Sequence, residues 1–401
     1  MKFAHMADIH IGGWKEPEIK ELGLKAFKEA VDKCLQEKVS FILISGDLFN
    51  TALPPIELIR DAAAALKKAK DNGINVYMIP GSHDFSPSGK TMLEVLEKAG
   101  LIDIVNKFDD NGLLTFTEDK TGAKITGLLG KKGGLEIKEY ESLEKKHLEE
   151  ETGFKVWMFH TALEEFKPES MEKMEAMATA ALPKNFNYYA GGHVHYIFQK
   201  RDKNSLIMFP GALFPNNFKE LEEFKHGGFY IVDDSLNYEY VHINLKDVKS
   251  YFFDANNKTP DALKQEILDK VSDYENKIVT LRIEGVLESG KPSDIDFKEI
   301  MAKMKSAFYV LKNTNKLTTK EFEELEVETG NVDDIERKII QEHLGQISFM
   351  NAEDEAKITE ALINALNQEK EEGEKNADFE LRVLVDSIKV LNLEPISRGI
   401  A

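Results

Sequence analysis

The chain reads Phe41-Ile42-Leu43-Ile44-Ser45-Gly46-Asp47 near its start, an apolar run that ends on a glycine and an aspartate. A short apolar run bounded by such residues is typical of a buried β-strand. Further segments rich in histidine and aspartate occur in the first half of the chain, and most of them also follow an apolar run: Asp8-Ile9-His10, Gly81-Ser82-His83-Asp84, His160-Thr161 and Gly192-His193-Val194-His195. This repetition predicts strands that each deliver polar side chains at their carboxyl ends.

Such side chains are expected to meet at one place. Residues just past the carboxyl ends of strands in an open α/β sheet converge on one crevice. Asp8 and Asp47 would meet several imidazoles there, and the cluster would repel itself and stay unsatisfied without a cation. Oxygen and nitrogen ligands in this mixture suit manganese, iron or zinc better than calcium. The pattern therefore predicts a pair of divalent metal ions, with Asp47 able to bridge them.

Each motif also has a structural interpretation when it is taken alone. An aspartate after a strand can cap a turn, and a strand-terminal histidine such as His160 is more often structural. Closely spaced histidines like His193 and His195 are common in surface sheets. The combination of all the segments is what favours a metal site. We interpret the remaining histidines as structural: His5, His147, His226, His242 and His343.

The segment Gly81-Ser82-His83-Asp84 is expected to contribute more than ligands. A protonated His83 could stabilise the developing charge on a phosphate, or protonate the leaving oxygen. Asp84 would orient the His83 ring and keep it charged by accepting its other N–H, or it would instead cap a helix or a turn. Gly81 permits a tight turn before these residues.

Composition limits the class of protein. At 401 residues the chain is expected to form two or three domains, and its 42% apolar content suits a globular protein with a substantial core. No apolar stretch approaches the roughly 18 residues that a membrane span needs. The N-terminus leads straight into the first motif, leaving no room for a signal peptide. The single Cys34 excludes an internal disulfide, so these features together predict a cytoplasmic protein.

The net charge of −19 argues at first sight against a nucleic-acid partner. From Lys320 onward, however, 21 acidic residues face nine basic ones, a net of −12, which leaves −7 for residues 1–319. Two bound divalent cations would offset about four of those charges. Net charge affects solubility and the steering of charged ligands, but it does not determine the reaction. The negative charge therefore does not exclude DNA as a partner.

The first domain is predicted to cover residues 1–245. Apolar runs alternate there with amphipathic stretches such as 18–36 and 56–72, which predicts βαβ units around a largely parallel sheet. Strand-like runs near its end would close the domain: 206–209, 229–232 and 238–245.

Three smaller segments follow. Residues 246–311 suggest a small α+β domain, with helices near 260–271 and 297–307 and strands near 277–283 and 309–311. Residues 312–332 lack apolar periodicity and are interpreted as a linker. Residues 333–401 predict short helices, which need a partner to bury their apolar faces.

The ordered motifs resemble those of the calcineurin-like metallophosphoesterase superfamily. The closer resemblance is to the SbcD-like nuclease subunits of DNA double-strand-break repair, and it rests on residues 4–12, on residues 46–50 and on Phe209-Pro210-Gly211-Ala212. It is specific over residues 1–245, and beyond them it rests on layout. It implies an α/β fold, a sandwich of mixed sheets flanked by helices, with a small α+β capping domain and C-terminal helices.

The resemblance also implies two manganese ions at the site. The first ion would be held by four residues: Asp8, His10, Asp47 and His195. The second would share Asp47 and be held by His160 and His193. The family usually has asparagine where this chain has Ser82, a shorter and weaker ligand, which puts the affinity of the second ion in doubt. His83 would act on the phosphate.

The implied activity is hydrolysis of DNA phosphodiesters by an exonuclease and endonuclease. Lys131-Lys132 and Lys200-Arg201 are candidate phosphate contacts, but each pair could equally be solvated surface, the interpretation that we favour for Lys200. The implied partners are DNA, a second copy of the chain and an SbcC-like coiled-coil ABC-type ATPase subunit. The homodimer would form through helices near 56–70 and 91–98. The ATPase would dock on the apolar faces of 335–344 and 358–366, with residues 246–311 as a DNA-binding cap.

Two other functions remain open at this stage. The chain could be a different metallophosphoesterase, acting on small phosphodiesters or on phosphoproteins, which would leave the C-terminal helices unexplained. It could also be a catalytically weak scaffold for the ATPase, in which Ser82 marks a degenerate site. Metal stoichiometry separates the scaffold from the enzymes, since a scaffold should bind one ion or none with useful affinity.

Overall fold

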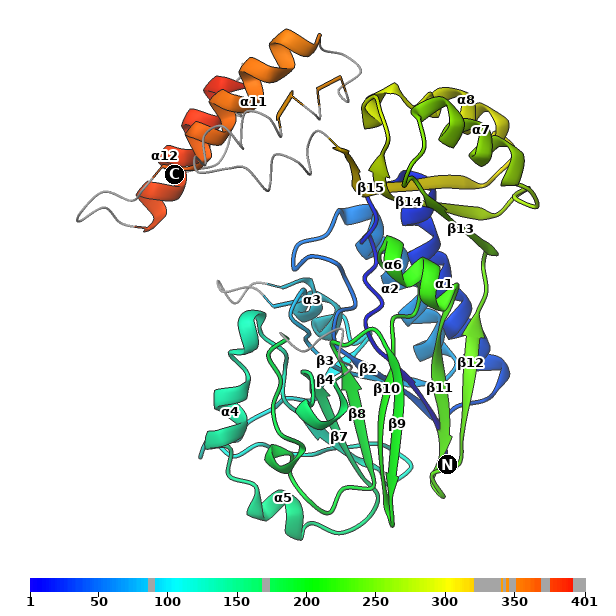
Figure 1. Ribbon diagram of the computed structural model, residues 1–401. Coiled ribbons are helices and arrows are strands. Elements are labelled where there is room, and N and C mark those ends of the chain that lie inside the picture. The colour runs from blue at the N-terminus through cyan, green and yellow to red at the C-terminus, as the bar shows by residue number, and fades with distance from the viewer. Residues whose placement is uncertain are drawn as a thin grey trace. The chain divides into compact units, whose positions relative to one another are not determined.

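The computed structural model describes residues 1–85, 91–167, 174–320, 340–341, 344–345, 351–368 and 376–391 (Figure 1). The chain divides into two compact units. The first contains Met1–Lys249 with Asn276–Ile278, and the second contains Ser250–Glu275 with Val279–Ala401. The candidate site lies in the first unit.

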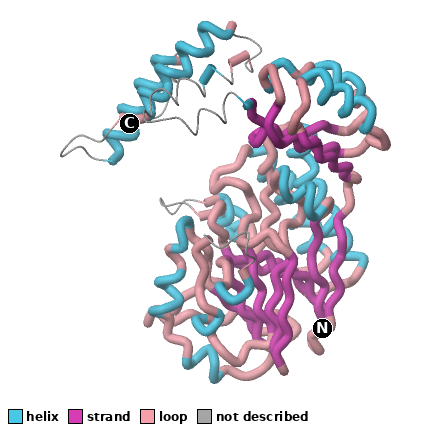
Figure 2. The backbone as a smooth tube through the Cα atoms, in the orientation of Figure 1, coloured by secondary structure: helices cyan, strands magenta, loops and turns pink. Residues whose placement is uncertain are grey.

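The first unit is built on two six-stranded mixed sheets (Figure 2). The first sheet has the order β12-β11-β1-β2-β3-β4, in which β1 to β4 run parallel and β11 is antiparallel to β1. Its strands are β1 (Lys2–Met6), β2 (Phe41–Ser45), β3 (Asn75–Ile79), β4 (Asp103–Ile104), β11 (Gly227–Asp233) and β12 (Tyr238–Ile243).

The second sheet has the order β5-β6-β7-β8-β10-β9, with a parallel centre from β6 to β10. Its strands are β5 (Thr117–Glu118), β6 (Lys124–Gly127), β7 (Lys155–His160), β8 (Tyr188–Gly192), β9 (Ile197–Asp202) and β10 (Ser205–Pro210). The outer strands β5 and β9 pair antiparallel to their neighbours.

The hydrophobic core of the unit lies between the two sheets. Alternate residues of each strand face it, including Phe3 and Phe41 from the first sheet and Val156 and Tyr188 from the second, and all four side chains are buried. Helices α1 (Pro17–Gln36) and α2 (Ile56–Asp71) pack against each other, and α2 also contacts β3. The further helical segments are α3 (Met92–Lys98), α4 (Ile137–Ser142), α5 (Lys146–Glu150), α6 (Phe218–Phe224) and the short 3-10 helices Lys132–Gly134, Glu164–Phe166 and Thr179–Ala181.

The second unit contains a three-stranded sheet in the order β13-β14-β15. Its core is formed by apolar side chains of this sheet and of two helices, such as Leu263, Leu281 and Ile300. The elements are β13 (Val248–Asp254), α7 (Pro260–Lys270), β14 (Ile278–Leu287), the 3-10 helix Pro292–Asp294, α8 (Phe297–Lys303) and β15 (Tyr309–Thr319). Two further helices, α11 (Ala352–Leu366) and α12 (Asn376–Val390), pack against each other.

The α/β sandwich of mixed sheets flanked by helices is confirmed, as is every strand expected before a site motif. Strands β4, β5, β6, β9 and β13 were not predicted. The linker predicted at residues 312–332 overlaps β15, which continues to Thr319. Residues 321–332 of that prediction lie outside the described residues. Within the described residues, no helix combines the length and the apolar character needed to cross a bilayer.

Candidate metal centre

The site lies where strands of both sheets end. Asp8 and His10 follow β1, and Asp47 follows β2 after a single glycine. Ser82 and His83 come after β3, His160 is the last residue of β7, and His193 and His195 follow β8. The structure brings these predicted residues together, so the convergence expected from the strand pattern is observed.

The backbone at the site adopts an unusual conformation. Asp8, His10, Asp47 and His193 all have positive φ angles, of 50°, 46°, 54° and 88°. Residues other than glycine rarely adopt positive φ angles, because this conformation is strained. It persists where contacts with the surrounding structure hold the backbone in place. Here the loops after β1 and β2 are joined, because Asp8 N donates to Gly46 O (3.2 Å) and His10 N donates to Asp47 O (2.9 Å).

Glycines next to the site allow close approach. A Cβ atom on Gly46, whose φ is +90°, would lie 2.1 Å from His160 Nδ1. A Cβ atom on Gly81 would lie 2.2 Å from Asp47 Oδ1, so Gly81 is required for space at Asp47. Larger residues at either position would displace a candidate ligand.

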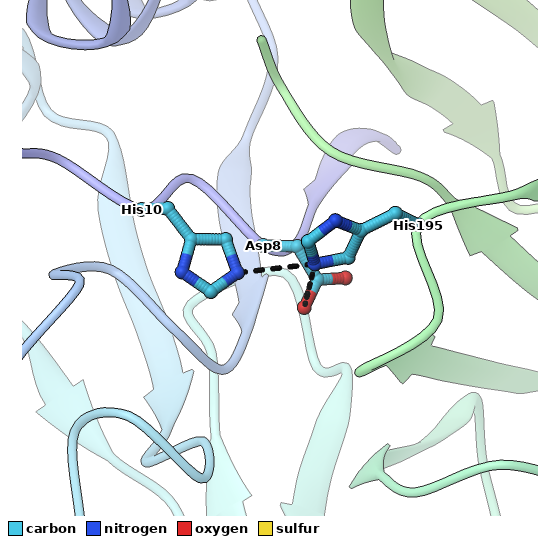
Figure 3. A group of neighbouring side chains, drawn as sticks. All are labelled: Asp8, His10 and His195. Carbon is cyan, nitrogen blue, oxygen red and sulfur yellow. Dashed lines mark hydrogen bonds and ion pairs between the residues drawn. The ribbon is translucent and has the colours of Figure 1, made fainter. Parts of the chain in front are cut away.

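One group of converging ligand atoms contains Asp8, His10 and His195 (Figure 3). His10 Nε2 lies 3.1 Å from His195 Nε2, and His195 Nε2 lies 3.8 Å from Asp8 Oδ1. Two imidazole nitrogens that bind the same ion at about 2.1 Å are brought to about 3 Å from each other. The spacing of His10 and His195 therefore fits a shared cation.

Asp47 belongs to two further groups, one with Asp8 and His160 and one with His10 and His83. Its Oδ2 lies 3.2 Å from His160 Nε2 and 3.7 Å from His10 Nε2. Asp8, His10 and Asp47 each belong to two of the three groups. Asp47 lies close to imidazoles of both of its groups, His10 and His160, as expected for a bridging ligand.

The chemistry of the donor atoms fits metal ions. His160 Nδ1 donates to the carbonyl oxygen of Ser45 (2.8 Å), so in the neutral ring Nε2 carries a lone pair. That Nε2 atom is buried and has no hydrogen-bond partner in the part of the chain that the structure describes. It faces the Asp47 carboxylate, which also offers only lone pairs. Two acceptors facing each other in a buried site need a cation between them. These residues therefore fit a divalent ion.

Without an ion, protons take over part of this role. Burial lowers the pKa of His160, but the Asp47 carboxylate outweighs it and raises the pKa to about 10. Burial also lowers the pKa of His195, but the hydrogen bond to Glu220 and the charge of Asp8 outweigh this effect and raise the pKa to about 9. Burial raises the pKa of Asp8 to about 7 and lowers that of His193 to about 4.

These shifts predict that metal binding depends on pH. An imidazole must be neutral to bind an ion, so ions displace protons that His160 and His195 hold below pH 10 and 9. Affinity should therefore rise between pH 6 and 8 by about tenfold per pH unit for each displaced proton. Calorimetry in two buffers of different ionisation enthalpy measures the release. Binding that is independent of pH and releases no proton would contradict the predicted ligand set.

His83 lies beside the cluster, and its ring centroid is 4.8 Å from that of His10. Its Nδ1 donates to the carbonyl oxygen of Asn50 (2.8 Å), which leaves Nε2 for a substrate or an ion. The prediction that Asp84 accepts from this ring is therefore wrong. Asp84 is buried and instead accepts from three backbone amides, those of Leu48 (3.1 Å), Phe49 (3.2 Å) and Gly81 (3.2 Å).

Asp84 consequently acts on the loops that carry the ligands. The amides it accepts from belong to the segments just after Asp47 and just before Ser82. A carboxylate that accepts hydrogen bonds from amides of two loops joins those loops. A hydrogen bond from the His83 ring alone would not join them. We therefore assign Asp84 to loop positioning rather than to orientation of His83.

Two predicted ligands lie less directly at the cluster. His193 stands beside His160, with ring centroids 5.2 Å apart, and its backbone N–H donates to both oxygens of Asp8 (3.0 and 3.1 Å). Ser82 is buried, and its Oγ lies 3.5 Å from Asp47 Oδ2, at the limit of a hydrogen bond. Both remain candidates for the second ion.

Glu220 and Ser45 were not predicted from the sequence. Glu220 Oε1 accepts from His195 Nδ1 (2.8 Å), and the Ser45 carbonyl accepts from His160 Nδ1 (2.8 Å). The only local signal for Glu220 was its position three residues after Asn217, the spacing of a capping box at the start of a helix. A backbone carbonyl such as that of Ser45 leaves no signal in the sequence.

Most histidines expected to be structural have structural partners. His5 is buried between Tyr188 Oη (2.8 Å) and Ser45 Oγ (3.0 Å). His147 Nε2 donates to Leu114 O (2.8 Å), and the Nδ1 atoms of His226 and His242 lie 3.1 Å apart. His343 lies outside the described residues.

Of the candidate phosphate contacts, Lys131, Lys200 and Arg201 have protein partners, and the side chain of Lys132 lies outside the described part of the chain. Lys131 pairs with Glu139 and lies over the Phe85 ring, 5.8 Å from its centroid. Lys200 lies over the Phe166 ring, 4.8 Å from its centroid, and Arg201 donates to Leu236 O. The backbone just before Lys131 lies beside the site, because Gly130 N donates to Pro80 O (2.9 Å) and Gly130 packs against His160.

The sandwich and its cluster of strand-end ligands define a calcineurin-like phosphoesterase, and the family model of that description matches residues 1–196. The DNA double-strand break repair protein Mre11 of Methanococcus maripaludis is 30% identical over 323 residues, covering 77% of this chain and 80% of that protein. Its counterpart in Methanocaldococcus jannaschii is 30% identical and covers 63% of this chain and 71% of that protein. The protein of the same name from Sulfolobus acidocaldarius is 25% identical, covering 92% and 96%. The chain belongs to the Mre11 family.

Proposed function

We propose that the protein is a manganese-dependent DNA nuclease, with exonuclease and endonuclease activity, that processes double-strand breaks together with a coiled-coil ABC-type ATPase. The observation that carries the proposal is the buried cluster in which Asp47 joins groups of converging ligand atoms from strands of both sheets. The name of the relatives, a DNA double-strand break repair protein, supplies the substrate class. Mixed carboxylate and imidazole ligands are compatible with manganese.

The reaction would be hydrolysis of a DNA phosphodiester. When bound, a pair of divalent ions would polarise the phosphate and lower the pKa of a water molecule to about 7. Asp8, Asp47 and the imidazoles would hold the ions, and the amide contacts of Asp84 would keep the ligand loops in place. His83 would donate a proton to the leaving oxygen or stabilise charge on the phosphate through Nε2, since Nδ1 is held by Asn50.

Cleavage of end-labelled linear duplex DNA in the presence of Mn²⁺ tests the proposal. We expect degradation that requires Mn²⁺ and stops when a chelator is added. Rapid turnover of a small aryl phosphodiester without DNA cleavage would favour a different phosphoesterase. A folded chain that binds one ion or none and hydrolyses neither substrate would favour the scaffold.

We expect that Ser82→Asn raises the affinity for the second ion. Asparagine would supply a carbonyl oxygen that reaches farther than Ser82 Oγ, which lies 3.5 Å from the bridging Asp47. A gain of about tenfold is expected for an added oxygen contact at a metal site, measured as the Mn²⁺ concentration that gives half-maximal cleavage. Ser82→Ala is the matched control, and it should weaken the second ion only if the hydroxyl takes part. An unchanged Mn²⁺ requirement in Ser82→Asn would remove Ser82 from the ligand set.

The ATPase would dock on the paired helices α11 and α12. Arg382 donates to Gln368, and Gln368 donates to Asp386 (3.2 Å), so polar contacts join the two helices. Leu381, Leu384 and Val385 follow helical spacing on α12 and are 41%, 49% and 40% exposed. The stretch 358–366 expected from sequence is half-buried at Ile358 and Leu362, and 335–344 lies mostly outside the described residues.

Leu384→Asp should weaken binding of the ATPase without changing Mn²⁺-dependent cleavage by the isolated chain. Burying a carboxylate in an apolar interface costs about 2 kcal/mol or more, which corresponds to about a thirtyfold higher Kd. Calorimetry or sedimentation with the ATPase subunit measures the change. Lys389→Ala, on the same helix, is the control and should bind normally. Equal binding by both variants would place the docking surface elsewhere.

A homodimer is proposed through the region around α2 and α3. Leu53, Ile56 and Val95 are large apolar residues that are 63%, 74% and 54% exposed, and such side chains favour a protein interface. Sedimentation of the native chain tests this, and a monomer at micromolar concentration would count against it.

A further inference from the structure

A further buried acid at the site, Glu220, accepts a hydrogen bond from one of the candidate ligand rings, on the side of the ring away from the cluster. Its Oε1 lies 2.8 Å from His195 Nδ1, and the side chains of Glu220 and His195 are 10% and 19% exposed. The two residues are 25 positions apart and come from different elements, α6 and the loop after β8. Among the described residues, the converging groups do not include Glu220, and its contact with a member of these groups is the hydrogen bond from His195.

The carboxylate is held in place independently of the imidazole. Asn216 N donates to Oε2 (2.7 Å), and the Asn217 side-chain amide donates to Oε1. Glu220 N in turn donates to Asn217 Oδ1 (3.0 Å), which closes a reciprocal cap at the start of α6. Leu221, the next residue, is fully buried and anchors the helix. Glu220 is therefore presented to His195 in a fixed orientation.

This contact determines what His195 offers to a metal ion. An ionised carboxylate only accepts hydrogen bonds, so Nδ1 must carry the proton and the neutral ring directs its Nε2 lone pair towards His10 and Asp8. A carboxylate partner also makes the imidazole a stronger ligand than a neutral partner does.

Two other rings of the cluster, those of His10 and His160, have no carboxylate partner at Nδ1 among the described residues. His160 Nδ1 donates to a backbone carbonyl, and His10 Nδ1 is buried without a hydrogen-bond partner in the described part of the chain. His195 is thus the ring among these three that a carboxylate supports. The two ions should consequently respond differently to a change at position 220.

We propose that Glu220 is a positioning residue that selects the tautomer of His195 and strengthens the ion held by Asp8, His10 and His195. The proposal rests on the proposed function only in that the site holds two divalent ions. It does not depend on DNA being the substrate.

Calorimetric titration of the full chain with Mn²⁺ tests the proposal. Glu220→Ala should weaken one of the two ions by about 10- to 100-fold and leave the other unchanged. Glu220→Gln should weaken the affinity for that ion less than Glu220→Ala does, because its amide oxygen still accepts from His195 Nδ1. Some loss of affinity should remain, because the amide carries no charge. Leu221→Ala is the matched control: it loosens the packing of α6 and should lower the Tm without changing either affinity.

Three results would overturn the proposal. The first is an unchanged Mn²⁺ affinity in Glu220→Ala, and the second is an equal fall in affinity for both ions. The third is a fall in Mn²⁺ affinity in Leu221→Ala as large as that in Glu220→Ala. A native chain that binds no Mn²⁺ would overturn it as well. A native chain that binds two Mn²⁺ ions but leaves DNA intact would instead reject the nuclease function, while the role of Glu220 would still be measured.

Discussion

His83→Ala is expected to lower Mn²⁺-dependent DNA cleavage by about 10²- to 10⁴-fold while both ions stay bound. The physical reason is the placement of the ring. Nδ1 is held by the Asn50 carbonyl, and the ring packs against His10, so Nε2 is fixed beside the cluster. Removing it takes away a proton donor and a partner for phosphate charge, but none of the ligands assigned to the ions.

Single-turnover cleavage and Mn²⁺ calorimetry on the same preparation measure the two effects separately. His242→Ala, which removes an exposed imidazole paired with His226, is the matched control and should cleave normally. Partial recovery of His83→Ala by added imidazole would support a direct chemical role. Loss of an ion in His83→Ala would instead make His83 a ligand, in keeping with its group with His10 and Asp47, and would contradict the assigned role.

Asp47→Asn is expected to abolish cleavage by weakening both ions together. Asp47 belongs to two of the three converging groups and lies 3.2 Å from His160 Nε2 and 3.7 Å from His10 Nε2. The charge of His160 lowers the pKa of Asp47 well below its ordinary range despite burial, so the carboxylate is ionised at neutral pH. Asparagine keeps the shape and can still accept from His83 N, a bond of 2.8 Å in the native chain, but it lacks the charge.

The readout is the stabilisation that Mn²⁺ provides. An ion at 100 times its Kd raises the free energy of unfolding by about 2.7 kcal/mol, and this rise should disappear in Asp47→Asn. Asp119→Asn, an equally isosteric change at a buried carboxylate that accepts from Tyr77, is the control and should keep both the Mn²⁺ effect and cleavage. Retention of one tightly bound ion in Asp47→Asn would show that Asp47 does not bridge.

The errors in the predicted fold have local physical causes. Strand β9 is one of the missed strands. Ile197–Asp202 is an edge strand whose Gln199-Lys200-Arg201-Asp202 run is exposed, so it lacks the apolar run that marked the predicted strands. The linker was placed too early because β15 is also an edge strand and carries the polar run Lys312-Asn313-Thr314-Asn315. Both β9 and β15 are stabilised by pairing with a neighbouring strand. The periodicity of the sequence does not reveal such pairing.

The sequence by itself determined which strands form and which side chains stand at their ends. Apolar runs such as Phe41–Ile44 bury on both faces, and the polar residue after each run must then leave the sheet at its edge. That local rule was enough to predict Asp8, His10, Asp47, His160 and His195 as one cluster, and the converging groups contain all of them.

Only the tertiary structure decided how each ring is oriented and supported. The hydrogen bond of Glu220 to His195, the Ser45 carbonyl on His160 and the amides around Asp84 join segments that are 25, 115 and up to 36 residues apart. The tautomer of an imidazole depends on the partner of its second nitrogen, and such partners are set by packing between elements rather than by neighbours in sequence. For this reason the sequence indicated the ligands, whereas the fold assigned their protons and the true partners of Asp84.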